Sequence, residues 1–183
     1  MRTHVLFVTS LTIASFFETL AFAQNEPFPG YDAKCGYRLI YAPTQTVSQA
    51  VIDRYGEEII VLDPSLAHEQ EAAQRTFLIA HECAHHRMDH AQDVSRKKRQ
   101  RSAKVVRDQE LSADCWAAET LAEIGEDRTI RIMADRFFKA GLYSPGGGYP
   151  AGMQRSTIVM HCAEKGRLAR MRSKSPDASS PLK

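Results

Sequence analysis

The sequence lacks the composition of a fibrous or low-complexity chain. It has ten glycines, eight prolines and 8% aromatic residues in 183, and no internal repeat. These amounts exclude a collagen-like or broadly disordered polymer. With 43% hydrophobic and 25% charged residues, the composition is that of one globular domain, which we place at 24–172. A chain of this length can bury a real core but is too short for two domains of usual size.

Long hydrophobic runs are missing beyond the N-terminal segment, so the mature chain is not expected to insert stably into a membrane. In that segment, basic Arg2 precedes an apolar run at 5–20, and Ala-Phe-Ala follows at 21–23. Small residues at these positions suit signal peptidase, and polar residues within the run favour cleavage over retention as an anchor. We therefore expect a signal peptide at 1–23 and export to the periplasm or the extracellular space.

The formal net charge of +2 hides an uneven distribution. Residues 96–107 hold seven Lys/Arg and no acid, and residues 165–183 hold six against one Asp, so the rest of the mature chain is acidic. An acidic body attracts a cation or a basic peptide more readily than a polyanion. The run at 96–107 has no interleaved aromatics, so we expect no nucleic-acid partner. A solvated loop, a processing site and a loop over the cleft remain open for it, and a disordered tail is expected at 173–183.

No cysteine pair has the CxxC spacing of a cysteine zinc site. The four cysteines all lie in the mature part of the chain: Cys35, Cys83, Cys115 and Cys162. An even number of cysteines in an exported protein suggests two disulfides, for which three pairings are possible. Free buried thiols are the alternative.

The hydrophobic pattern predicts an α+β domain, mostly helical, with a small antiparallel sheet before the first long helix. Strands are expected at 37–42, 51–55 and 59–62, the last two as a hairpin. Helices are expected at 66–91, 104–124, 127–138 and 153–170. Ser65 is the expected N-cap of the first helix, and Gly125 and Gly141 are expected to end the second and third.

Residues 81–85 read His-Glu-Cys-Ala-His, an HExxH motif inside the first predicted helix. Histidines four residues apart share a helix face, so both imidazoles can bind one metal ion. Zinc in catalytic sites takes such nitrogens with a third protein ligand and leaves one position for water. Glu82 would lie beside the ion, where it can take a proton from that water. A histidine-rich face without metal is the alternative, because His86 and His90 follow.

The third ligand is expected on the second predicted helix, where Glu110 and Asp114 share a face. Glu110 can bind the metal, and Asp114 can accept an N–H from a ligand histidine and fix its tautomer. We therefore expect Zn²⁺ on His81, His85 and Glu110. A solvated acidic face is the alternative for this pair.

HExxH followed by Glu-x-x-Ala-Asp at 110–114 resembles the gluzincin metallopeptidases, particularly the branch of the CaaX prenyl endopeptidases and their small soluble relatives. The resemblance covers about 55–160 and implies a zincin-like fold. Residues 59–62 resemble that family's edge strand, which pairs with extended substrate. Residues 149–155 resemble its His-Pro-x-Gly-x-x-Arg element, with Tyr149 in place of the histidine. The transmembrane helices of the CaaX type are missing, which favours the secreted kind.

Motifs and resemblance together imply a zinc metallopeptidase acting on peptide or protein substrates. Zinc would polarise the scissile carbonyl, and Glu82 would act as the general base. Arg155 or Tyr149 would steady the oxyanion. The alternative function is a zinc-binding module with little or no turnover that acts through protein interaction, which the missing histidine at position 149 motivates.

Overall fold

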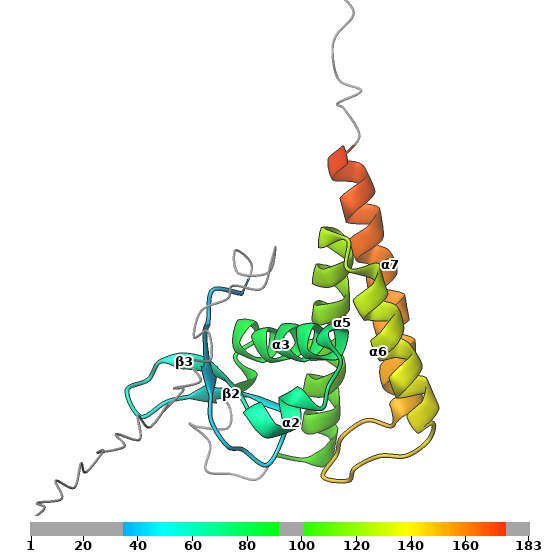
Figure 1. The fold of residues 1–183 in the computed structure, drawn as a ribbon. Coiled ribbons are helices and arrows are strands. Elements are labelled where there is room, and N and C mark those ends of the chain that lie inside the picture. The colour runs from blue at the N-terminus through cyan, green and yellow to red at the C-terminus, as the bar shows by residue number, and fades with distance from the viewer. Residues whose placement is uncertain (1–34, 92–100, 175–183) are drawn as a thin grey trace, which may run out of the picture.

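The structure, a computed structural model, describes residues 35–91 and 101–174 (Figure 1). The strands are β1 (Arg38–Tyr41), β2 (Ser48–Ile52) and β3 (Glu58–Leu62), and the helices are α2 (Pro64–His68), α3 (Ala72–Arg87), α5 (Ala103–Ile124), α6 (Asp127–Ala140) and α7 (Gly152–Lys174). This mostly helical chain with a small sheet fits the expected α+β class. The predicted signal peptide, residues 96–100 of the basic run and residues 175–183 of the predicted tail lie outside the described residues. Residues 173 and 174, also expected in the tail, belong instead to α7.

The sheet has β3 in its centre, between β1 and β2. β2 and β3 form an antiparallel hairpin as predicted, with Ala50 opposite Ile60, but β2 spans Ser48–Ile52 and not the predicted 51–55, because residues 53–57 form the turn. β1 runs parallel to β3. The expectation of an antiparallel sheet is therefore wrong, and so is the expectation that 59–62 is an edge strand. These four residues are all buried and apolar, as is typical of a strand covered on both faces and flanked on both sides.

The long helix predicted across the HExxH motif is divided into α2 and α3. Asp63 caps α2 by accepting a hydrogen bond from the Ser65 N–H at 2.9 Å, and Pro64 occupies the first turn. The predicted N-cap at Ser65 is therefore wrong. A second start follows at Glu71, whose side chain forms a capping box with Gln74. This reciprocal pair satisfies backbone N–H groups at a new helix start, so the chain turns before the motif.

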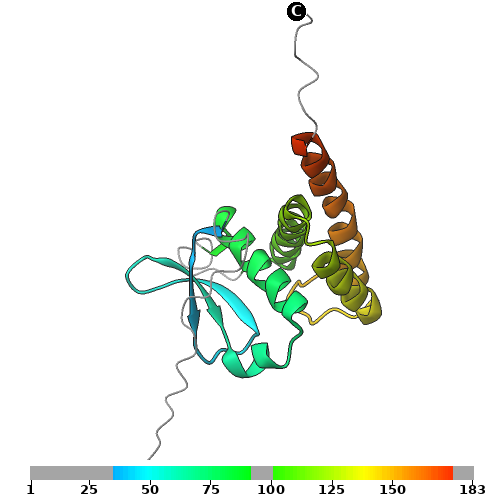
Figure 2. The same ribbon diagram turned by 45° about the horizontal axis from the view of Figure 1, so that its top comes forward.

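α3 lies between the sheet on one side and the bundle of α5, α6 and α7 on the other (Figures 1 and 2). Its buried apolar residues belong to the same core as buried residues from β3 and all three bundle helices. These core residues of α3 are Phe77, Ile79, Ala80 and Cys83. Because both sides of α3 are covered, its polar side chains find partners on the sheet as well as on α5.

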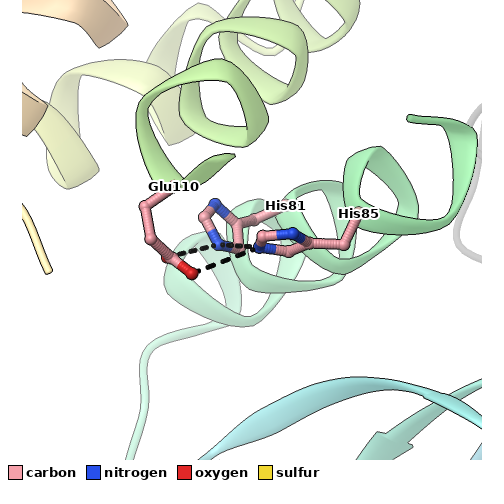
Figure 3. A group of neighbouring side chains, drawn as sticks. All are labelled: His81, His85 and Glu110. Carbon is pink, nitrogen blue, oxygen red and sulfur yellow. Dashed lines mark hydrogen bonds and ion pairs between the residues drawn. The ribbon is translucent and has the colours of Figure 1, made fainter. Parts of the chain in front are cut away.

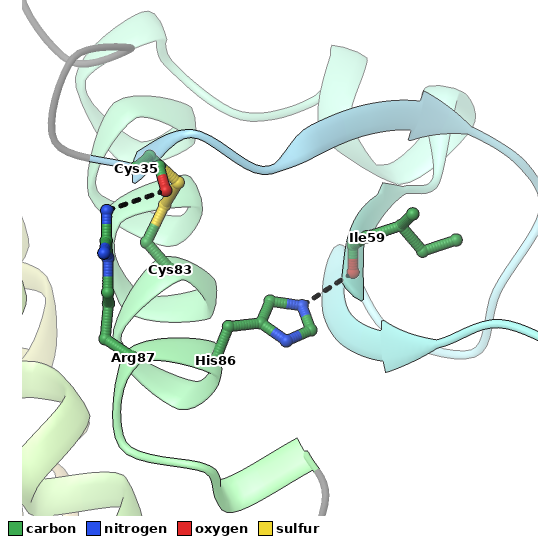
Figure 4. Close-up of a disulfide and its surroundings, with 5 residues drawn as sticks. All are labelled: Cys35, Ile59, Cys83, His86 and Arg87. Atoms are coloured by element: carbon green, nitrogen blue, oxygen red, sulfur yellow. Dashed lines mark hydrogen bonds between the residues drawn. A yellow bond between two sulfur atoms is a disulfide. The ribbon is translucent and has the colours of Figure 1, made fainter. Parts of the chain in front are cut away.

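The four cysteines form two disulfides, Cys35–Cys83 and Cys115–Cys162, which selects one of the three possible pairings. The first ties the chain just before β1 to α3 (Figure 4), and the second ties α5 to α7. The alternative of free thiols is therefore wrong. Two disulfides are compatible with an exported protein. Within 35–91 and 101–174, no helix combines the length and apolar character needed to cross a membrane.

Candidate metal centre

His81 and His85 on α3 and Glu110 on α5 converge on one point (Figure 3). The two histidine Nε2 atoms lie 3.0 Å apart. Glu110 places Oε2 3.2 Å from His81 Nε2 and Oε1 3.5 Å from His85 Nε2. One ligand atom from each residue lies within 4.8 Å of the others, and all three residues are buried. The structure thus brings the three predicted ligands together in a group that could hold a metal ion.

Helix geometry explains this convergence. Residues four apart lie on one helix face, so the two histidines of α3 present their rings one above the other. α5 begins at a cap in which Ser102 accepts a hydrogen bond from the Val105 N–H, and its face with Glu110 packs against α3. Small buried residues allow helix axes to approach closely, and both helices carry them: Ala80, Ala84, Ala113 and Ala117.

The pKa values of the two imidazoles are shifted in opposite directions. Burial alone would lower the pKa of His81, but hydrogen bonds to Asp114 and Glu110 outweigh it and raise the pKa to about 10. Burial and the neighbouring charge of His81 lower the pKa of His85 to about 2. At neutral pH the two rings therefore share one proton beyond those of their neutral forms, and it is on His81. A metal cation bound by the two rings can replace this proton.

Asp114 forms the support behind His81. It is fully buried, and its Oδ1 accepts a hydrogen bond from His81 Nδ1 at 2.9 Å. Arg155 on α7 donates two bonds to the same carboxylate, from Nε and Nη2, each at 2.7 Å. Burial would raise the pKa of Asp114, yet the charge and hydrogen bonds of Arg155 hold it below its usual value. A His81 Nδ1–H that donates to Asp114 leaves Nε2 free to bind a metal, as the sequence predicts.

The two residues predicted to steady an oxyanion have different surroundings. Arg155 lines the cleft, but its guanidinium is engaged with Asp114 and lies 4.1 Å from the centroid of the Phe137 ring. Tyr149, in the loop between α6 and α7, lines the cleft and is 41% exposed. Burial, together with the charges of Glu110 and Glu82, raises the pKa of Tyr149. Tyr149 therefore keeps its phenolic proton at neutral pH and can donate it in a hydrogen bond.

Glu82 contacts the sheet instead of α5. The Ser48 hydroxyl donates to its Oε1 at 2.7 Å, and the Ala50 N–H donates to its Oε2 at 2.8 Å. Burial raises the pKa of Glu82, although the charge of His81 and the Ser48 hydrogen bond act in the opposite direction. The sequence predicts Glu82 but not its two partners on β2. Only the alternation of β2, which gives residues 48 and 50 the same face, could have pointed to them.

His86 and His90, which suggested a histidine-rich face without metal, have different contacts. The side chain of His86 points away from the candidate metal centre and toward β3, where its Nε2–H donates to the Ile59 carbonyl at 2.8 Å (Figure 4). His90 follows Asp89, whose left-handed backbone (φ 58°) comes just after the end of α3. The Nδ1 atoms of His90 and His85 lie 3.0 Å apart. The histidines of this segment are therefore not a common solvated face.

A cleft of about 540 Å³ opens beside the centre. Its lining includes residues 46–52 on and before β2, the three candidate ligands, Glu82 and Tyr149. Arg101, which belongs to the predicted basic run, also lines the cleft. Of the other described residues of that run, Lys104 and Arg107 lie on α5.

Comparison of the chain with models of protein families, with curated proteins and with solved structures found no match. The likeness to gluzincins therefore depends on the motif residues. In the structure, three of these motif residues, His81, His85 and Glu110, lie close together.

Proposed function

We propose that the chain is an exported, zinc-dependent metallopeptidase of the gluzincin type. The observation that carries this proposal is the convergence of His81, His85 and Glu110 beside a cleft that Glu82 also lines. Two imidazoles and one carboxylate are a common ligand set of catalytic zinc sites, which leave the fourth position open. Structural zinc sites use four protein ligands, and the group found among residues 35–91 and 101–174 has three.

The chain's own side chains fit the steps of peptide-bond hydrolysis. Zinc held by the three ligands would supply Lewis-acid polarisation of the scissile carbonyl and would acidify a water molecule. Glu82 takes the proton of the attacking water and passes it to the leaving amine, a role that suits a carboxylate with a raised pKa. Tyr149 donates its O–H to the carbonyl oxygen as negative charge develops there. Asp114 holds the ring of His81 in orientation.

A peptide substrate fits the wall of the cleft that β2 forms. β2 pairs only with β3 in the described sheet, and its other edge lies at the cleft. The backbone N–H of Asp53 bonds to Glu57, and the carbonyl of Val47 accepts from Asp63, so positions 48, 50 and 52 direct their backbone groups away from β3. The Ala50 N–H is bonded to Glu82 and the Ser48 carbonyl to the Thr46 hydroxyl, so an extended peptide would lie along this edge without replacing these two bonds. The run of residues 46–52 along the cleft supports an extended peptide over a compact small molecule.

The first prediction concerns Glu82→Gln. In the zinc-loaded protein this change removes the proton acceptor, and cleavage of a peptide library should fall by a factor of about 10² to 10⁴. Zinc should remain bound at one ion per chain, because Glu82 is not a ligand. Undiminished cleavage by the variant would contradict the assigned role. A wild-type protein that binds zinc and cleaves nothing would favour the zinc-binding module.

A further inference from the structure

Two donors on β2 hold the carboxylate of Glu82, and we name them the Ser48–Ala50 fork. The Ser48 hydroxyl reaches Oε1 at 2.7 Å, and the Ala50 N–H reaches Oε2 at 2.8 Å. The fork arises from the register of β2, since residues 48 and 50 share a sheet face and Ala50 directs its N–H away from β3. It therefore joins α3 to the strand that lines the cleft.

We propose that Ser48 is the positioning residue of Glu82 in peptide hydrolysis, an inference that rests on the proposed function. Each carboxylate oxygen receives one hydrogen bond from the fork, which fixes the plane of the carboxylate. Each oxygen keeps a second lone-pair direction, so the group can still accept a proton. Ser48 and Glu82 are each only 8% exposed, so bulk water has little access to replace these bonds.

The two arms of the fork differ in what they require of the sequence. Any residue but proline supplies the backbone N–H at position 50, whereas the other donor depends on the hydroxyl of Ser48. The Thr46 hydroxyl donates to the Ser48 carbonyl at 2.9 Å, which holds the backbone of Ser48 in place. Losing the hydroxyl would leave Oε1 without its donor, and the carboxylate could turn about the remaining bond.

The test compares three variants of the zinc-loaded, disulfide-intact protein on one cleavable peptide. Ser48→Ala should lower kcat about 10- to 100-fold with KM and zinc affinity nearly unchanged, and Ser48→Thr should recover most of kcat. Ser156→Ala is the matched control, because Ser156 is also buried and donates one 2.8 Å bond, to the Ala134 carbonyl, outside the cleft. It should leave kcat unchanged. Equal kcat in Ser48→Ala and wild type would overturn the inference.

A double-mutant cycle in urea measures the contact itself, without using activity. If Ser48 and Glu82 act as a pair, the double variant Ser48→Ala/Glu82→Ala shows a smaller shift of the unfolding midpoint than the sum of the single variants. Shifts that add would overturn the inference. A wild-type protein without any hydrolysis overturns the proposed function and the role of Ser48 together. Hydrolysis by wild type with additive shifts overturns only the role of Ser48.

Discussion

The side of α3 that faces α5 and the side that faces the sheet hold their polar groups by different means. Toward α5, His81 lies against two carboxylates, and the deeper one, Asp114, is paired with Arg155. Toward the sheet, Glu82 has two neutral donors, a hydroxyl and a backbone N–H. Two buried opposite charges depend on one another for compensation, whereas losing one neutral donor from a carboxylate that keeps another donor has a smaller cost. We therefore expect the α5 side to determine stability and metal affinity, and the sheet side to determine the rate.

Arg155→Ala should have the largest effect on stability. It leaves the fully buried Asp114 without its bidentate partner, and breaking such a pair costs about 3 kcal/mol of the free energy of unfolding. Ser48→Ala, on the other side of α3, removes one of two donors to a carboxylate and should cost about 1.5 kcal/mol. Urea unfolding of both variants measures the difference.

The control for Arg155 is Arg167→Ala, which removes an arginine from the more exposed pair with Asp127. Ion pairs open to solvent are worth about 1 kcal/mol or less, and Asp127, which is 26% exposed, keeps Arg170 as a second partner. If Arg155→Ala cost no more than Arg167→Ala or Ser48→Ala, the two sides of α3 would not differ as described.

The next prediction concerns zinc affinity, which should rise with pH. Without metal, the pKa of His81 is about 10, above its ordinary value, so at neutral pH the ring is in its charged form, with a proton on both nitrogens. That proton stabilises the metal-free fold below about pH 6.5, and its contribution is lost as the pH rises through the folded pKa. A metal on Nε2 displaces the proton, so affinity should rise about tenfold per pH unit between about pH 6 and 8.

Competition with a chromophoric chelator measures this dependence. Ser48→Ala should keep the same slope, because its hydroxyl contacts Glu82 and not the ligand rings. A wild-type affinity that does not change with pH would show that His81 binds no metal in place of its proton.

Much of the α5 side follows from sequence. The four-residue spacing of His81 and His85, and of Glu110 and Asp114, fixes which side chains share a helix face, and that local rule holds wherever the helices pack. The partner of Asp114 does not follow, because Arg155 reaches it from another helix, 41 residues further along the chain. The sequence predicts that Arg155 belongs to the site, but as a residue that steadies an oxyanion and not as the partner of Asp114.

The sheet side is less predictable, because it depends on strand order and register. The sequence predicts the hairpin of β2 and β3, yet the parallel β1 comes from a pairing between segments that no turn joins. This pairing moves β3 to the centre and makes β2 the strand at the cleft. Ser48 meets Glu82 across 34 residues, a contact that requires both the register and the docking of α3.

Peptide hydrolysis by this protein should require a metal on His81, His85 and Glu110. The most direct test is the cleavage rate of the chelator-treated protein as zinc is added back. If this requirement holds, cleavage is absent without zinc and its rate saturates at one ion per chain, with no such recovery in Glu110→Ala. Cleavage that persists in the metal-free protein, or full recovery in Glu110→Ala, would contradict it.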